Sequence, residues 1–79
     1  MTTQFYCQIW TNGDLANDAD GLTPQAAFAA AVQDVELRGL TAMYLLQQIE
    51  KLKSNRYVGG YAHYFEQGST LVRIVLETA

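Results

Sequence analysis

Cys7 and His63 are the side chains of this sequence that could form a nucleophile and its base. A thiol beside an imidazole is the minimum for a cysteine nucleophile, because the imidazole can accept the thiol proton. No cysteine-hydrolase signature surrounds Cys7, and a buried cysteine usually behaves as a small hydrophobic side chain. We therefore expect both residues to be packed in the core, and a small enzyme with a Cys–His dyad is kept as an alternative.

The acidic segment 12–22 (NGDLANDADGL) offers oxygen ligands of the kind that calcium prefers. These are Asp14, Asn17, Asp18 and Asp20. If Gly21 took the invariant glycine position of an EF-hand loop, the first and last ligands would fall on Ala16 and Ala27, which carry no oxygen. We predict a solvated loop without a metal site, whose Asp18 and Asp20 could present carboxylates to a basic partner.

Basic side chains gather in the last third of the chain, where they could contact phosphate. They are Lys51, Lys53, Arg56 and Arg73. Some proteins that bind single-stranded RNA combine such charges with aromatic residues on an open sheet. The usual aromatic-glycine signature is missing, and the net charge of −3 opposes binding to phosphate. A nucleic-acid-binding module using Tyr6, Trp10, Tyr64 and Arg73 is therefore an alternative rather than the leading hypothesis.

Two helices are predicted in the middle of the chain. The first covers residues 24–38, because Thr23 is a good N-cap, Pro24 suits the first helical position and the alanine-rich run has high helix propensity. The second covers residues 42–54, with Thr41 as its N-cap and an apolar stripe at helical spacing. A single bent helix is the alternative at the junction.

Three strands are predicted around these helices. Residues 4–11 are rich in aromatic and β-branched side chains, and residues 57–65 and 70–77 form a hairpin around Gln67-Gly68. The segment 12–22 is predicted to be a loop that begins at the turn dipeptide Asn12-Gly13. The fold class is therefore α+β in the order β-α-α-β-β, a three-stranded, mainly antiparallel sheet with both helices on one face. The sequence does not decide which strand is central.

Alternation along the strands predicts which side chains face the helices. Phe65 is placed opposite Thr70 and Tyr64 opposite Leu71. The core face then holds Phe5, Cys7, Ile9, Tyr61, His63, Phe65, Val72, Ile74 and Leu76. The other face holds Tyr6, Gln8, Trp10, Tyr64, Leu71, Arg73 and Val75. Tyrosine, tryptophan and arginine are enriched in binding hot spots, so this second face is the predicted docking surface. The alternatives are an inverted assignment or a segment that folds over the face.

The composition restricts the function classes. The 79 residues fit a single domain, 1–79, and hold one cysteine, too few for an internal disulfide or a thiolate zinc site. We find no signal peptide and no apolar run long enough to cross a membrane, and therefore expect a cytoplasmic protein.

The leading hypothesis is a non-enzymatic protein-binding module, an adaptor or inhibitor that docks on a larger protein or complex and needs no cofactor. It would use Tyr6, Trp10, Tyr64, Leu71, Arg73, Asp18 and Asp20. Small acidic proteins of this kind include phage-encoded inhibitors of host defence such as anti-CRISPR proteins, which is an association by class only. A homodimer through the same face is a secondary prediction.

Overall fold

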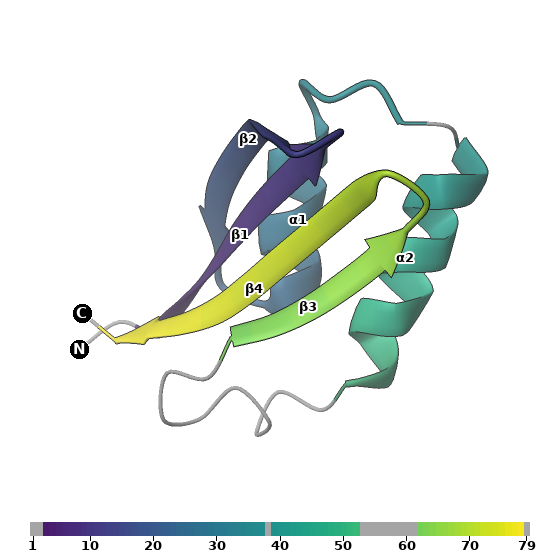
Figure 1. Cartoon of the computed structure of the whole chain (residues 1–79). Helices are drawn as coiled ribbons and strands as arrows, with labels where there is room; N and C mark the ends of the chain where they lie inside the picture. Colours follow the sequence, from purple (N-terminus) through teal and green to yellow (C-terminus); the bar gives the residue numbers. More distant parts are fainter. Residues whose placement is uncertain (1–2, 38, 53–61, 79) are drawn as a thin grey trace.

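The computed structural model describes residues 3–37, 39–52 and 62–78. The elements along the chain are β1 (Thr3–Thr11), β2 (Asp14–Gly21), α1 (Pro24–Val32), α2 (Gly39–Lys51), β3 (Ala62–Gln67) and β4 (Thr70–Thr78). The strands form one antiparallel sheet in the order β2-β1-β4-β3, and both helices lie behind it in the view of Figure 1. The predicted α+β class is confirmed, but the sheet has four strands, so the predicted three strands and β-α-α-β-β order are wrong.

The additional strand is β2, which lies in the segment predicted to be a loop. Asn12 and Gly13 have φ of 53° and 85°, as a two-residue type I′ turn requires, and this turn sends the chain back along β1. Aspartate and asparagine have low strand propensity, which is why the sequence pattern indicated a loop. Pairing with β1 and packing against α1 outweigh that propensity.

The helices occur where they were predicted, with different ends. α1 begins at Pro24, and the hydroxyl oxygen of Thr23 accepts a hydrogen bond from Ala26 N at 3.0 Å, which confirms the N-cap. α1 ends at Val32 instead of residue 38, because Val35 and Leu37 leave the helix and pack at the margin of the core.

α2 begins at Gly39, so Thr41 lies inside the helix and is not its N-cap. The predicted end at residue 54 falls outside the described residues, and the last helical residue described is Lys51.

The β3–β4 hairpin turns at Gly68-Ser69, one residue later than predicted. Gly68 is the first turn residue and has a φ of 61°, as a type II′ turn requires. Tyr64 is consequently opposite Arg73 instead of Leu71, and Phe65 is opposite Val72. A change of two residues in the pairing leaves every side chain on its predicted face, because strand side chains alternate with a period of two. The predicted strand residues 57–61 lie outside the described residues.

The core lies between the helices and one face of the sheet. Its buried members are Phe5, Cys7, Ile9, Ala27, Phe28, Ala31, Leu45, Ile49, Val72 and Ile74, and Phe65 and Leu76 pack against them. The predicted alternation of the strands is therefore confirmed for these apolar residues. His63 is on the same side of the sheet but is only half-buried, and Tyr61 lies outside the described residues. Since β1 and β4 are the two central strands, their outward side chains occupy the middle of the opposite face.

Candidate docking face

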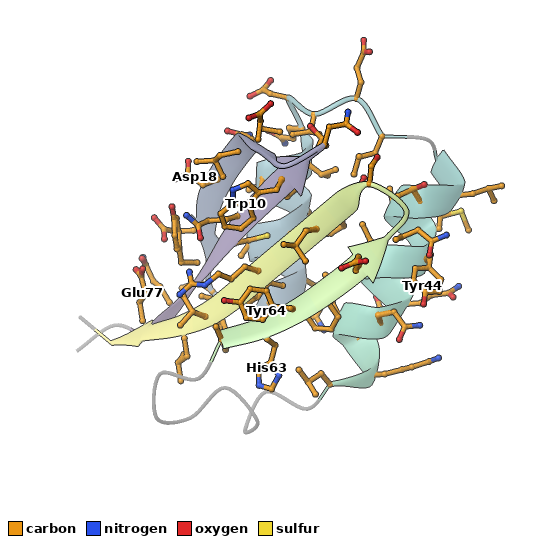
Figure 2. All side chains as sticks on the ribbon, in the orientation of Figure 1. Trp10, Asp18, Tyr44, His63, Tyr64 and Glu77 are labelled. Carbon is orange, nitrogen blue, oxygen red and sulfur yellow. The ribbon has the colours of Figure 1, made fainter. Side chains whose placement is uncertain are left out.

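The sheet surface turned away from the helices, here called the open face, collects side chains from all four strands. It comprises Leu15, Asp18 and Asp20 of β2; Gln4, Tyr6, Gln8 and Trp10 of β1; Leu71, Arg73, Val75 and Glu77 of β4; and Ala62, Tyr64 and Glu66 of β3. Figure 2 shows Trp10, Asp18 and Tyr64 on the side facing the viewer, and no described segment crosses in front of them. Every residue predicted to bind a partner lies on this face.

Cross-strand pairing fixes which residues of the open face are neighbours. Trp10 is opposite Leu71, and Leu71 is opposite Glu66 on its other side. In the adjacent row, Arg73 lies between Gln8 and Tyr64, and its Nη1 donates a hydrogen bond to Gln8 Oε1 at 3.0 Å. This hydrogen bond holds the guanidinium of Arg73 toward β1.

A shallow hollow of about 700 Å³ lies on the open face near the two hairpin turns. It is lined by Gln8, Trp10, Gly13, Tyr64, Glu66, Gly68, Ser69, Thr70, Leu71 and Arg73. Leu71 and Arg73 come from the central strand β4, whereas Trp10 and Tyr64 come from the strands on either side of it. The hollow therefore has an aromatic side chain on each flank, and Tyr64 is 61% exposed.

Asp18 lies beside the aromatic residues instead of in a separate loop. The hydroxyl of Tyr6 donates a hydrogen bond to the carboxylate of Asp18, and Asp20 is directly opposite Tyr6. The pKa of Tyr6 is raised above its ordinary value of 10.0, mainly because its hydroxyl is hydrogen bonded to Asp18 and secondarily because it is partly desolvated. Tyr6 is therefore a neutral phenol in the physiological range of pH, and its hydroxyl holds the Asp18 carboxylate at the face.

The charges of the open face are mostly negative. Its described residues include four carboxylates, of Asp18, Asp20, Glu66 and Glu77, and one cation, Arg73. Of the basic side chains predicted to gather in the last third of the chain, Arg73 lies on this face, whereas Lys51 is in the last turn of α2. Lys53 and Arg56 lie outside the described residues.

Cys7 and His63 are on the helix side of the sheet but belong to strands separated by β4. Both are paired with Ile74, one on each side of it, so their backbones are two strand spacings apart, about 10 Å. Cys7 is fully buried, and burial raises the pKa of its thiol to about 12. At neutral pH the residue is a protonated thiol packed among apolar side chains.

Sequence reasoning did not identify Leu15, Glu66 and Glu77 as members of the face. Leu15 is 51% exposed beside Trp10, and a bulge between these strands sets its position. The turn dipeptide Asn12-Gly13 was the signal that could have revealed β2, because it is typical of hairpins with two-residue loops.

A second exposed apolar group lies on α2, away from the sheet. Leu40, Met43 and Tyr44 are 81%, 59% and 41% exposed, and Figure 2 shows Tyr44 directed outward from the helix. These residues follow the three- and four-residue spacing of one helix face. They offer a matched control surface for tests of the open face.

Comparison with known proteins does not assign this chain to a family. No protein-family model matches it, and no match was found among curated proteins or solved structures. Within the described residues, no helix is both long and apolar enough to cross a membrane, and no three His, Cys, Asp or Glu side chains are grouped as metal ligands would be.

Proposed function

We propose that this protein is a non-enzymatic protein-binding module that docks on a larger protein or complex through the open face of its sheet. The observation that carries the proposal is the composition of the face: Trp10, Tyr64 and Arg73 surround one hollow on a surface that no described segment covers. Tryptophan, tyrosine and arginine dominate binding hot spots. Contiguous apolar surface on a small domain commonly marks an interaction site.

The arrangement of these residues supports docking by a rigid surface. Trp10, Leu71 and Arg73 belong to the two central strands, which hydrogen bond to neighbours on both sides. Arg73 is oriented in advance by Gln8, and Tyr6 by Asp18. Side chains held in place before binding lose less conformational entropy when a partner arrives. An adaptor or an inhibitor requires only such a surface.

The location that we propose is the cytoplasm. The lone Cys7 is buried as a thiol, and a domain of this size made for an oxidising compartment would usually carry disulfides.

The test is a comparison of partner capture by the wild-type protein and by Trp10→Ala, Arg73→Ala and the control Tyr44→Ala. Proteins retained from the native host are quantified by mass spectrometry, and the affinity for a retained protein is then measured directly. We expect Trp10→Ala and Arg73→Ala each to weaken binding by about 30-fold, the effect of losing a hot-spot residue worth about 2 kcal/mol. Tyr44→Ala is expected to bind as the wild type does.

Folding and alternative partners are checked in parallel. Circular dichroism and denaturant unfolding should show that Trp10→Ala and Arg73→Ala remain folded, because both residues are only half-buried and lie outside the core. Cooperative unfolding of either variant at much lower denaturant would assign the residue a core role and refute the proposal. If Tyr44→Ala were the only variant that lost partner binding, the docking surface would be assigned to α2 instead. Tight binding of RNA or single-stranded DNA that weakens steeply with salt would favour the nucleic-acid alternative.

A further inference from the structure

Three of the four carboxylates of the open face lie on the two edge strands of the sheet. Asp18 and Asp20 lie on the edge strand β2, and Glu66 lies on the opposite edge strand β3. The row that crosses the sheet from Glu66 contains Leu71 and Trp10 on the two central strands and ends at Leu15 on β2. Asp18 and Asp20 lie on β2 in the two rows beyond Leu15, opposite Gln8 and Tyr6. The arrangement is an aromatic and aliphatic centre with negative charge at both edges of the sheet.

The one cation of the described face does not neutralise these edges. Arg73 lies in a central strand and donates to Gln8, a neutral amide, and no hydrogen bond from it to a carboxylate is found among the described residues. Charges at the rim of an interface select partners of opposite sign, because like charges brought together are strongly unfavourable. The edges of this face therefore disfavour phosphate and acidic partners.

The hollow suits a long cationic side chain. Leu71 provides an apolar surface on the strand between Trp10 and Tyr64. The carboxylate of Glu66, which is opposite Leu71, lies in the same lining. Arg73 also lines the hollow, but its hydrogen bond to Gln8 draws its guanidinium toward β1, on the side away from β3 and Glu66. Lysine and arginine have apolar stems and a charged end, so a stem can cover Leu71 while the charged end reaches Glu66. The faces of tryptophan and tyrosine rings also attract cations.

We propose that the partner of the open face is a basic protein surface, with an apolar centre bordered by lysine and arginine. One of these side chains occupies the hollow between Trp10 and Tyr64 and forms an ion pair with Glu66. This inference rests on the proposed function, since it names the chemistry of the partner that docks on the same face.

The test uses three synthetic probes of matched length. One is a peptide of alternating lysine and serine with a central leucine, the second has glutamate in place of each lysine, and the third is an oligodeoxythymidine. Each is titrated into the isotope-labelled protein and followed by NMR. We expect the lysine peptide to shift the amides of the open face and the indole N–H of Trp10, with an affinity that falls as salt is added. The other two probes should leave these signals unmoved.

A pair of charge variants tests the position of the carboxylates. Asp20→Asn/Glu66→Gln and the control Asp34→Asn/Glu50→Gln each remove two negative charges from a net charge of −3, and all four residues are exposed. Exposed ion pairs are individually weak, so we expect the first variant to bind the lysine peptide roughly 2- to 30-fold less tightly. The control variant is expected to change the affinity by less than about 2-fold, because Glu50 lies in α2 and Asp34 follows α1, on the helix side of the sheet, and salt screens charges that do not contact the peptide.

Several results would overturn the inference. They are preferential binding of the glutamate peptide or oligonucleotide, no binding of the lysine peptide at millimolar concentration, or equal losses in both charge variants. The native partner distinguishes this failure from failure of the proposed function. If the partner does not bind Trp10→Ala but still binds Asp20→Asn/Glu66→Gln, the proposed docking face is supported and the inference that the partner is basic is refuted. A partner retained by both variants refutes the docking face as well.

Discussion

Gly21, the last residue of β2, is required where this strand meets α1. A Cβ atom on Gly21 would lie 2.4 Å from the backbone nitrogen of Ala27 and 2.8 Å from Ala27 Cα. Cβ atoms do not approach other heavy atoms within 3.0 Å, so β2 and α1 would have to separate by at least 0.6 Å. Both contacts are to helix backbone, which cannot rotate away as a side chain can. Gly21→Ala is therefore expected to destabilise the fold.

The expected loss follows from the cost of overpacking. Forcing extra atoms into a close-packed contact costs about 1–3 kcal/mol, whereas the total stability of a domain of this length is roughly 4–12 kcal/mol. Gly39→Ala is the matched control, because nothing lies within 4 Å of its added Cβ. Where the backbone permits it, alanine in place of glycine stabilises a protein by about 0.4–1 kcal/mol, since the unfolded chain loses freedom. The two substitutions should therefore change the stability in opposite directions.

The assay is urea unfolding followed by the fluorescence of Trp10, the one tryptophan of the chain. With an m-value of about 1 kcal/mol/M, Gly21→Ala should lower the midpoint by about 1–3 M. Gly39→Ala should raise it slightly. A Gly21→Ala protein as stable as the wild type would show that β2 does not pack against α1 in this way. The strand that brings Asp18 and Asp20 to the open face would then be in doubt as well.

Two further predictions concern Cys7 and the start of α1. Burial raises the pKa of Cys7 from 9.0 to about 12, so the buried thiol contributes stability that is complete below pH 9 and is lost as the pH rises toward 12. Native protein should not react with a thiol reagent at neutral pH, and rapid reaction without unfolding would contradict the burial. Thr23→Ala removes the acceptor of the Ala26 hydrogen bond and should lower the free energy of unfolding by about 0.5–2 kcal/mol, with Thr23→Ser retaining most of it.

Local patterns in the sequence predicted those parts of the fold whose signals agree with their surroundings. Thr23 and Pro24 mark the start of α1 by their own chemistry, independent of the rest of the molecule. The alternation of Phe5, Cys7 and Ile9 with polar and aromatic residues corresponds to a strand buried on one side only. In both places the local preference and the tertiary contacts lead to the same conformation.

β2 could not be predicted from propensity, because its residues form a strand only through their neighbours. It contains three aspartates, an asparagine and a glycine among its eight residues, a composition typical of loops. Its backbone is held by β1 on one side, and the side-chain amide of Asn17 donates to Ala31 O of α1 at 2.8 Å. An edge strand with acidic side chains also resists pairing with other chains, which is a reason for such residues to occupy it.

The error in hairpin register did not change which side chains were assigned to the open face. The missed strand, in contrast, adds acidic residues to that face. A slip of one residue would have turned Tyr64 toward the helices, but the pairing differs by two and the side chain remains outside. The missed strand matters more. With residues 12–22 predicted to be a loop, the aromatic face and the acidic segment were two separate surfaces that could bind a partner. Since β2 pairs with β1, Asp18 and Asp20 lie directly beside Gln8 and Tyr6 on one continuous surface. A partner that covers Trp10 and extends to the sheet edge must therefore accommodate these carboxylates, which is why the charge of the partner becomes a testable property of the aromatic face.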